Sequence, residues 1–168
     1  IKEFQDLTVL EIGQSASSTL IAVTKEKGPV RWQNGKVVEI NNKKIREESL
    51  LKSPIIIFED EESKIWSALP ESGIMTFTER ELNRMTTRSG LASDVITNII
   101  KDNNRNVFIT TDRSLTKITR SGKMYSITKS DGLINFGFTR TSAFISSKGE
   151  IYLGSRDGIT IIRSQPGK

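Results

Sequence analysis

The residues that the sequence lacks restrict its chemistry more than any motif that it contains. Cysteine and histidine are both absent from the 168 residues. Without cysteine the chain has no disulfide, no thiolate nucleophile and no cysteine-bound metal. Without histidine it has no Ser-His-Asp triad, no histidine-ligated zinc and no histidine phosphoacceptor. No carboxylate pair recurs in the strands predicted below. We therefore predict no catalytic residues, no metal site, no cofactor and no enzyme activity.

Basic side chains are the candidates for a binding role. The chain has 25 lysine and arginine residues against 20 aspartate and glutamate residues, and the surplus lies wholly in residues 61–168. Arg88, Arg113 and Arg156 recur at comparable places in predicted loops, and Lys129 lies in a further loop. A ring of guanidinium groups suits carboxylate or sulfate groups, because each arginine can bind such a group through two hydrogen bonds. The alternative is that each arginine pairs with a neighbouring acid on a solvated surface.

Two polar runs and two tryptophans are weaker candidates. The runs Glu59–Glu62 and Asp102–Asn106 lack the spacing of a calcium-binding loop, so we interpret both as turns between a first and a second strand. Trp66 occupies a recurring position and is predicted to pack in the core. Trp32 precedes Asn34-Gly35, a predicted hairpin turn, and is the more open candidate for stacking on a sugar ring.

A repeat of about 42 residues positions these side chains. An aliphatic–aromatic pair occurs at Ile65-Trp66, Val107-Phe108 and Ile151-Tyr152, at spacings of 42 and 44 residues. A second marker, a small residue that begins the next apolar stretch, is found at Gly28, Gly73, Ser114 and Gly158. A third marker relates Ser89-Gly90-Leu91 to Asp131-Gly132-Leu133, again 42 residues apart. Three markers that keep one phase indicate a genuine repeat.

Each repeat has the periodicity of strands. In one copy Val95–Lys101 is apolar and β-branched, a run of turn formers follows, and Val107–Thr110, Ser114–Thr119 and Lys123–Thr128 are predicted as three further strands. Four short antiparallel strands in about 42 residues are typical of a propeller blade. No segment has the sustained i, i+3, i+4 apolar pattern of an α-solenoid. We predict an all-β fold, a β-propeller of about four blades of four antiparallel strands.

The repeat also gives the expected blade boundaries within a single propeller segment, residues 1–168. The blades are predicted at residues 7–40, 53–86, 92–128 and 138–163. The last range lacks a fourth strand of its own, and Ile1–Phe4 fits an outer strand. That strand either closes a ring with the last blade or completes an adjoining blade. The start at isoleucine and the usual number of four to eight blades favour a piece of a larger propeller.

These residues resemble a known family. The unit from Leu91 to Ile118 resembles the two-component regulator propeller repeat, whose pattern is roughly L-P-S-N-x-V-x-x-I-x-E-D-x-x-G-N-L-W-I-G-T-x-x-G-L. The segment from Asp131 to Ile159 is similar to the last blade of that family. The sequence departs from the pattern at Ser67, Thr110 and Ser114, which stand where glycine is usual.

The resemblance implies a function that the residues alone do not. It implies a ligand-sensing segment in the extracytoplasmic region of a hybrid two-component signal transduction protein. The implied ligand is an oligosaccharide, anionic if the basic residues bind it. The implied location is the periplasm, with the parent protein anchored in the inner membrane and its histidine kinase outside this chain. Further partners would be the remaining blades and the downstream domain of the parent chain.

A non-catalytic propeller scaffold for protein–protein interaction is the alternative function. A four-blade arc would expose apolar blade faces, which predicts self-association, for example as a homodimer. Nucleic acid is not an expected partner, because no run of basic residues is longer than Lys43-Lys44. No stretch of 18 apolar residues occurs, so we expect no direct membrane insertion of this segment.

Overall fold

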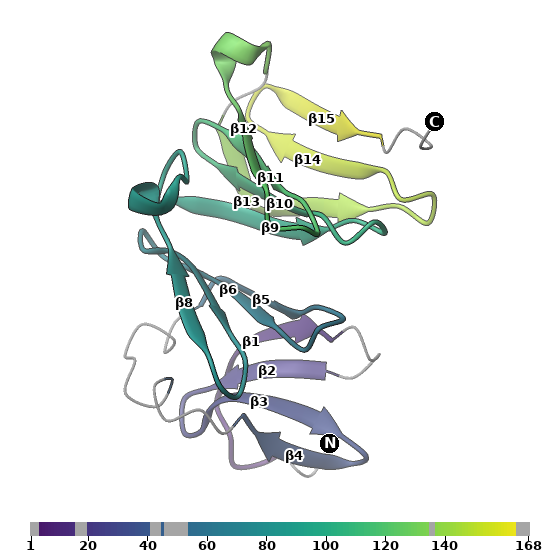
Figure 1. Cartoon of the computed structure of the whole chain (residues 1–168). Helices are drawn as coiled ribbons and strands as arrows, with labels where there is room; N and C mark the ends of the chain where they lie inside the picture. Colours follow the sequence, from purple (N-terminus) through teal and green to yellow (C-terminus); the bar gives the residue numbers. More distant parts are fainter. Residues whose placement is uncertain (1–3, 16–19, 41–44, 46–53, 135–136, 164–168) are drawn as a thin grey trace. The chain divides into compact units, whose positions relative to one another are not determined.

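The computed structural model describes residues 4–15, 20–40, 45, 54–134 and 137–163 (Figure 1). The described residues form fifteen β-strands in four antiparallel sheets, with short helical turns between some of them. The chain divides into two compact units, Ile1–Met85 and Thr86–Lys168, which we call unit 1 and unit 2. Each unit contains two of the sheets.

Unit 1 consists of two four-stranded sheets in which strands pair in chain order, β1-β2-β3-β4 and β5-β6-β7-β8. Their bounds are β1 (Val9–Gln14), β2 (Leu20–Thr24), β3 (Gly28–Gln33), β4 (Lys36–Glu39), β5 (Ile56–Glu59), β6 (Ile65–Leu69), β7 (Gly73–Phe77) and β8 (Leu82–Met85). The turn between β3 and β4 is the predicted Asn34-Gly35 hairpin, and both residues have positive φ angles. This is the conformation that the two-residue hairpin requires.

Unit 2 consists of one four-stranded and one three-stranded sheet, with the orders β9-β10-β11-β12 and β13-β14-β15. Their bounds are β9 (Ile96–Lys101), β10 (Val107–Thr111), β11 (Leu115–Ile118), β12 (Met124–Ile127), β13 (Phe138–Ile145), β14 (Ile151–Ser155) and β15 (Gly158–Ile162). In the described residues, β15 is the last strand.

The middle strands are buried on both faces, which explains their composition. Every residue of β6, β7 and β10 is buried, whereas the outer strands β4 and β12 are mostly exposed. A strand covered on both faces cannot alternate apolar and polar side chains, and it therefore contains aliphatic, aromatic and small hydroxyl residues. Trp66 in β6 is 7% exposed and stacks on Phe58, so its predicted packing role is confirmed.

In unit 1 the inner strands β1 and β5 lie against each other. An isolated parallel bridge joins Ser15 to Glu59. A Cβ atom added at Gly13 would overlap the carbonyl group of Ile57, so only glycine fits this approach of two backbones. The cluster between the two sheets is apolar and consists of Ile21, Val23, Ile40, Ile45, Ile57, Ile65, Leu69, Met75 and Phe77. Burial of each such side chain contributes on the order of 1.5–3 kcal/mol.

In unit 2 the inner strands β9 and β13 lie side by side (Figure 1). The Asn98 side-chain amide donates to the Thr110 hydroxyl at 3.0 Å and to the Thr139 carbonyl at 2.9 Å, so it links the two sheets. The Thr97 and Thr110 hydroxyls are 2.7 Å apart. The adjoining apolar cluster consists of Phe108, Leu115, Leu133, Phe138, Ile151 and Leu153. The aromatic residue of the first marker therefore fills the space between two sheets, as a stacked repeat requires.

The third sequence marker is a one-turn helix that precedes an inner strand. Thr87–Ser89 forms η3 and Lys129–Asp131 forms η4. Each turn ends at a glycine in the left-handed region, with φ of 103° at Gly90 and 91° at Gly132. A side chain is strained in this conformation, which explains the glycine. The leucine that follows each glycine is buried and fixes the turn to the core.

The four sheets lie within the residue ranges that the repeat predicts for the blades. Of the outer strand predicted at Ile1–Phe4, residues 1–3 lie outside the described residues. The Phe4 carbonyl accepts a hydrogen bond from the Leu7 N–H at 3.1 Å within a turn, and the predicted strand stays a prediction. Within the described residues, no helix combines the length and the apolar character needed to cross a membrane.

Candidate functional site

A hollow of about 660 Å³ in unit 2 brings together two of the basic residues named from the sequence. We call it the basic hollow. Its lining residues are Ala92, Arg113, Ser114, Thr128, Lys129 and Ser130. Arg113 comes from the turn between β10 and β11, and Lys129 comes from η4, which follows β12. The hollow thus lies where a loop within a sheet meets a connection between sheets.

The β10–β11 turn holds Arg113 through side-chain hydroxyls. The Thr111 hydroxyl accepts hydrogen bonds from the backbone N–H groups of Arg113 at 3.2 Å and Ser114 at 3.1 Å. The Thr111 and Ser114 hydroxyls are also 2.9 Å apart, and both residues are buried. The second marker has glycine at this place in the other three copies. At this position Ser114 therefore adds a side-chain hydroxyl to the hydrogen bonds of the turn.

The η4 turn holds Lys129 in an equally defined backbone. The Asp131 carboxylate accepts hydrogen bonds from the Thr128 N–H at 3.0 Å and from the Thr128 hydroxyl at 2.9 Å. These two hydrogen bonds, the backbone one first, lower the pKa of Asp131 below its ordinary value. The carboxylate therefore stays ionised at neutral pH and closes the turn that carries Lys129 toward the hollow.

The guanidinium group of Arg113 is accessible to a ligand. Its side chain is 85% exposed, and its Nε donates to the Asp112 carboxylate at 3.1 Å. Pairing with a neighbouring acid, the alternative considered from the sequence, therefore occurs at Arg113. An exposed pair of this kind contributes only about 0–1 kcal/mol, so it costs little to redirect the guanidinium toward an anion. The other oxygen of Asp112, Oδ1, is buried and has no hydrogen-bond partner among the described residues.

The other three residues named from the sequence do not line the basic hollow. Arg88 is exposed in η3, and Arg156 is exposed in the turn between β14 and β15. The backbone N–H of Arg156 donates to the Gly137 carbonyl at 3.4 Å. Trp32 lies in β3 of unit 1 and is partly buried, and its Nε1 has no acceptor among the described residues. The three-arginine ring and the stacking role of Trp32 stay predictions.

A second hollow, of about 640 Å³, lies in unit 1 and was not identified from the sequence. We call it the polar cleft. Its lining residues are Ser15, Arg31, Gln33, Glu59, Asp60, Glu61, Glu62, Ser63, Thr78, Glu79 and Arg80. They come from the ends of β1, β3 and β5 and from the turns that follow β5 and β7. Charged and hydroxyl side chains from both sheets of unit 1 therefore meet at one place.

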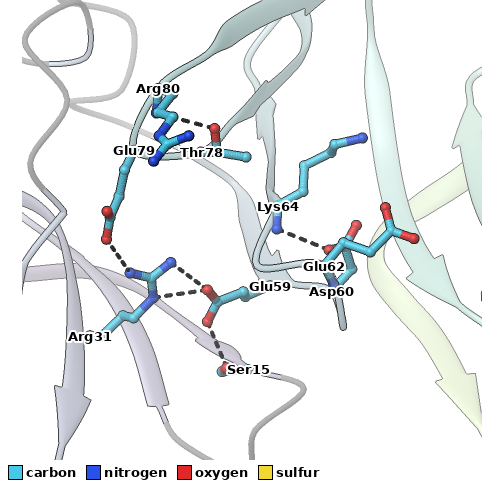
Figure 2. Close-up of polar contacts among 9 residues, drawn as sticks. All are labelled: Ser15, Arg31, Glu59, Asp60, Glu62, Lys64, Thr78, Glu79 and Arg80. Carbon is cyan, nitrogen blue, oxygen red and sulfur yellow. Dashed lines mark hydrogen bonds and ion pairs between the residues drawn. The ribbon is translucent and has the colours of Figure 1, made fainter.

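The centre of the polar cleft is a buried ion pair between the two sheets of unit 1. Figure 2 shows the guanidinium group of Arg31 between the carboxylates of Glu59 and Glu79. Glu59 is only 5% exposed, and its Oε1 accepts hydrogen bonds from Nε and Nη2 of Arg31. Its Oε2 accepts from the Ser15 hydroxyl at 2.6 Å. The Nη1 atom of Arg31 lies 3.6 Å from the Glu79 carboxylate.

Glu59 corrects one interpretation made from the sequence. The sequence predicts a turn over Glu59–Glu62, but Glu59 is the last residue of β5 and is buried. The turn itself depends on Asp60, whose Oδ1 accepts from the backbone N–H groups of Glu62 at 3.0 Å and Lys64 at 2.9 Å. Asp102 makes the same two contacts in the β9–β10 turn. Each run is thus a turn built on one aspartate, and Glu59 has a separate role.

Within the part of the chain that the structure describes, no group of three or more acidic side chains is arranged to hold a metal ion. What the two sites offer is non-covalent recognition. The basic hollow presents cations to the solvent, and the polar cleft presents hydrogen-bond donors beside acceptors.

Solved structures share this arrangement of sheets. The extracellular domain of a protein described as a hybrid two-component system from B. thetaiotaomicron aligns with a TM-score of 0.68 and 19% identity, over 91% of this chain and 21% of that one. A second such domain from B. thetaiotaomicron aligns with a TM-score of 0.67 and 18% identity, over 92% and 22%. Virginiamycin B lyase from Staphylococcus aureus aligns with a TM-score of 0.60 and 15% identity, over 95% and 57%.

These alignments decide the architecture. The fold is that of a β-propeller. At identities below 20% the propeller likeness shows the fold alone, because one fold serves many functions. The propeller chain described here spans about a fifth of the length of the two extracellular domains. No protein-family model and no curated protein sequence matches it.

Proposed function

We propose that this chain is a ligand-sensing segment in the extracytoplasmic region of a hybrid two-component protein, and that it binds an anionic oligosaccharide at the basic hollow. The sensor role is supported by the propeller fold shared with extracellular domains described as parts of two-component systems. The ligand class is supported by the two cations at one hollow, Arg113 and Lys129. That hollow is the single observation on which the site assignment depends.

The geometry of the basic hollow suits a sugar that carries a carboxylate or sulfate group. The exposed guanidinium of Arg113 can form two parallel hydrogen bonds to such a group, and the ammonium of Lys129 adds a second positive charge. Thr128 and Ser130 add hydroxyl groups that can bond to sugar hydroxyls. The backbone around both cations is fixed by side-chain hydrogen bonds, so little order must be gained on binding.

The remaining blades of a parent chain are the proposed neighbours of the last sheet. In unit 2, Phe108 and Leu115 of the third sheet are covered by the fourth. The residues 44 positions later are Tyr152 and Ile159, and Ile159 is 63% exposed; Phe144 beside Tyr152 is 65% exposed. A further sheet of the same repeat would cover this apolar face as the fourth sheet covers the third. The periplasmic location and the inner-membrane anchor belong to the same proposal.

A non-catalytic scaffold is the second candidate function, and the same apolar face favours it. Exposed aromatic and aliphatic side chains on one face of a sheet are typical of a surface that contacts another protein. A second copy of this chain would use this face in a homodimer. The scaffold predicts binding through Phe144 and Ile159 but no effect of Arg113 or Lys129 on any ligand.

The binding proposal is tested by removing both cations of the basic hollow. We expect the double variant Arg113→Ala/Lys129→Ala to bind a heparin-derived hexasaccharide or a galacturonic acid hexamer at least about tenfold more weakly, because each charged hydrogen bond contributes about 1.5–3 kcal/mol. The variant Arg120→Ala/Lys148→Ala removes two exposed cations from other turns of unit 2 and is the matched control. Isothermal titration calorimetry measures the affinity of the oligosaccharide for the unmodified chain, the double variant and the control variant.

The outcomes separate the basic hollow from the larger ring. If the control variant loses as much affinity for the oligosaccharide, the effect comes from net charge alone, and the basic hollow is rejected as the binding site. The triple variant Arg88→Ala/Arg113→Ala/Arg156→Ala tests the ring of arginines named from the sequence. If it binds no more weakly than Arg113→Ala alone, Arg88 and Arg156 have no part in the site.

A further inference from the structure

The polar cleft of unit 1 has the size and the lining of a small-molecule site. Its volume of about 640 Å³ lies within the range of ligand pockets, about 300–1,000 Å³. Its walls come from two sheets, and Arg31, Glu59 and Ser15 join those sheets through hydrogen bonds (Figure 2). The central groups are therefore held in place before any ligand arrives, as a preformed site requires.

The guanidinium of Arg31 is only partly satisfied within the cleft. Its side chain is 16% exposed, and its Nε and Nη2 donate to Glu59. Its Nη1 lies 3.6 Å from the Glu79 carboxylate, a separation too long for a hydrogen bond. A separation of this kind leaves room for a bridging oxygen atom. The Nη1 atom of Arg31 therefore pairs with Glu79 by charge but makes no direct hydrogen bond to it.

The acceptors of the cleft are not all available to a ligand. Glu59 is neutralised by Arg31, and Asp60 is used by the β5–β6 turn, where its Oδ2 also accepts from the Trp66 indole at 2.9 Å. Glu79 is 68% exposed and stands beside Arg31. The Thr78 hydroxyl accepts from the backbone N–H groups of Arg80 and Glu81, which fixes the turn that carries Glu79.

This pattern of one donor beside one acceptor selects the ligand chemistry. An anion would satisfy Arg31 but would be repelled by the carboxylates of the lining, which outnumber its two arginines. A simple cation would bind to the Glu79 carboxylate, but it could not accept a hydrogen bond from the Nη1 atom of Arg31. A hydroxyl group both donates and accepts, so neighbouring hydroxyls on one molecule can satisfy Arg31 and Glu79 together.

We infer that the polar cleft binds a neutral polyhydroxylated ligand the size of one or two sugar rings, with its hydroxyl groups bridging Arg31 and Glu79. This inference depends on the proposed function only for the choice of sugars as the ligand class. It differs from the proposed function in its unit, its residues and the charge of its ligand. The Ser63 hydroxyl and the Gln33 amide also line the cleft and can supply further hydrogen bonds to such a ligand.

Nuclear magnetic resonance of the arginine side chain tests the inference directly. The Nε–H of Arg31 is hydrogen-bonded to Glu59, which protects its proton from exchange and makes its signal observable. We expect mannohexaose, xylohexaose or maltohexaose to shift this signal at millimolar concentration. The variant Glu79→Gln keeps the Arg31–Glu59 pair and should weaken binding about tenfold, since one hydrogen bond to a charged group contributes about 1.5–3 kcal/mol.

The control variant is Glu71→Gln, which removes an exposed carboxylate of unit 1 outside the cleft. It should bind the neutral sugars as the unmodified chain does. The inference is overturned if none of the three sugars shifts the Arg31 signal, or if Glu79→Gln binds as tightly as Glu71→Gln. Titration with the heparin-derived hexasaccharide separates the two proposals. If the heparin-derived hexasaccharide binds at the basic hollow but the neutral sugars do not bind at the polar cleft, only the polar-cleft proposal is rejected. If the neutral sugars bind but the hexasaccharide does not, only the basic-hollow proposal is rejected.

Discussion

The two pairs of sheets solve the same packing problem with different chemistry. In unit 1 the inner strands approach so closely that only glycine fits at position 13, and the polar link between the sheets is the ion pair of Arg31 and Glu59. In unit 2 the link is neutral: the Asn98 amide bonds to Thr110 and Thr139 across the inner strands. The repeat therefore specifies where two sheets meet, but it does not determine which polar side chains link them.

This difference has an energetic consequence. A buried charge that loses its partner typically costs about 3–5 kcal/mol, whereas a lost neutral hydrogen bond costs about 1–3 kcal/mol. The sheet contact in unit 1 is therefore more sensitive to single substitutions than the contact in unit 2. The molecule allows the two to be followed separately, because both tryptophans, Trp32 and Trp66, are in unit 1 and both tyrosines, Tyr125 and Tyr152, are in unit 2.

The largest expected effect comes from Gly13→Ala. The new methyl group would overlap the backbone carbonyl of Ile57, which cannot move without displacing β5. We expect unit 1 to lose about 3 kcal/mol of unfolding free energy or more, at the upper end of overpacking effects. Urea unfolding followed by tryptophan fluorescence measures the change.

The matched substitution in unit 2 is Gly154→Ala. Its new methyl group would meet the Cβ and Oγ atoms of Ser142 at 3.0 Å, a contact that a shift of a few tenths of an ångström relieves. A cost of about 1 kcal/mol is expected there by the same overpacking argument. Equal losses in the two units would contradict the view that the backbone contact at Gly13 is the tighter of the two glycine contacts.

Glu59→Gln is the next largest expected effect and tests the charge of the link. The change keeps the shape of the side chain but removes its negative charge, so Glu79 at 3.6 Å becomes the remaining carboxylate partner of Arg31, whose side chain is 16% exposed. We expect a loss of about 3 kcal/mol in unit 1. Asn98→Ala, its counterpart in unit 2, should cost about 1–2 kcal/mol. A larger loss for Asn98→Ala than for Glu59→Gln would reverse the comparison between the units.

Local patterns predicted the elements, because strands and turns depend on neighbours in sequence. The apolar, β-branched run Val95–Lys101 and the turn formers after it predicted β9, β10 and the turn between them. The marker Ser89-Gly90-Leu91 indicated a recurring position, but its helical turn, η3, was seen only in the structure. The Asn34-Gly35 hairpin followed from the same reasoning. These features require no knowledge of which sheet packs on which.

The polar cleft could not be predicted in this way. Arg31 and Glu59 are 28 residues apart and belong to different sheets, and neither stands at a marker of the repeat. Glu59 also precedes Asp60, so the acidic run was explained by the turn that Asp60 alone forms. Arg113 and Lys129, in contrast, lie in adjacent loops of one repeat, and the order of strands places them near each other.

The smallest expected effect compares two copies of one helical turn inside unit 2. In η4 the Asp131 carboxylate accepts from the Thr128 N–H, whereas in η3 the Ser89 hydroxyl accepts from the Thr86 N–H at 2.7 Å. The Thr128 hydrogen bonds lower the pKa of Asp131 in the folded chain. A lowered pKa means that the carboxylate stabilises the fold above its unfolded-state pKa, and that this stabilisation is lost as the pH falls through the folded-state pKa.

Asp131→Ser gives η4 the serine hydroxyl that η3 has at the same place. The variant should therefore lose the part of the pH dependence of stability that comes from the Asp131 carboxylate. We expect the variant to have a slightly lower Tm than the unmodified chain at pH 6, and the two Tm values to converge as the pH is lowered toward 3. Asp157→Asn removes an exposed carboxylate from the β14–β15 turn, where it caps no helix, and serves as the control. Circular dichroism melts at pH 3, 4, 5 and 6 give the comparison. A constant difference between the Tm values at every pH would show that serine and aspartate differ only in turn geometry, and that the charge of Asp131 adds nothing to unit 2.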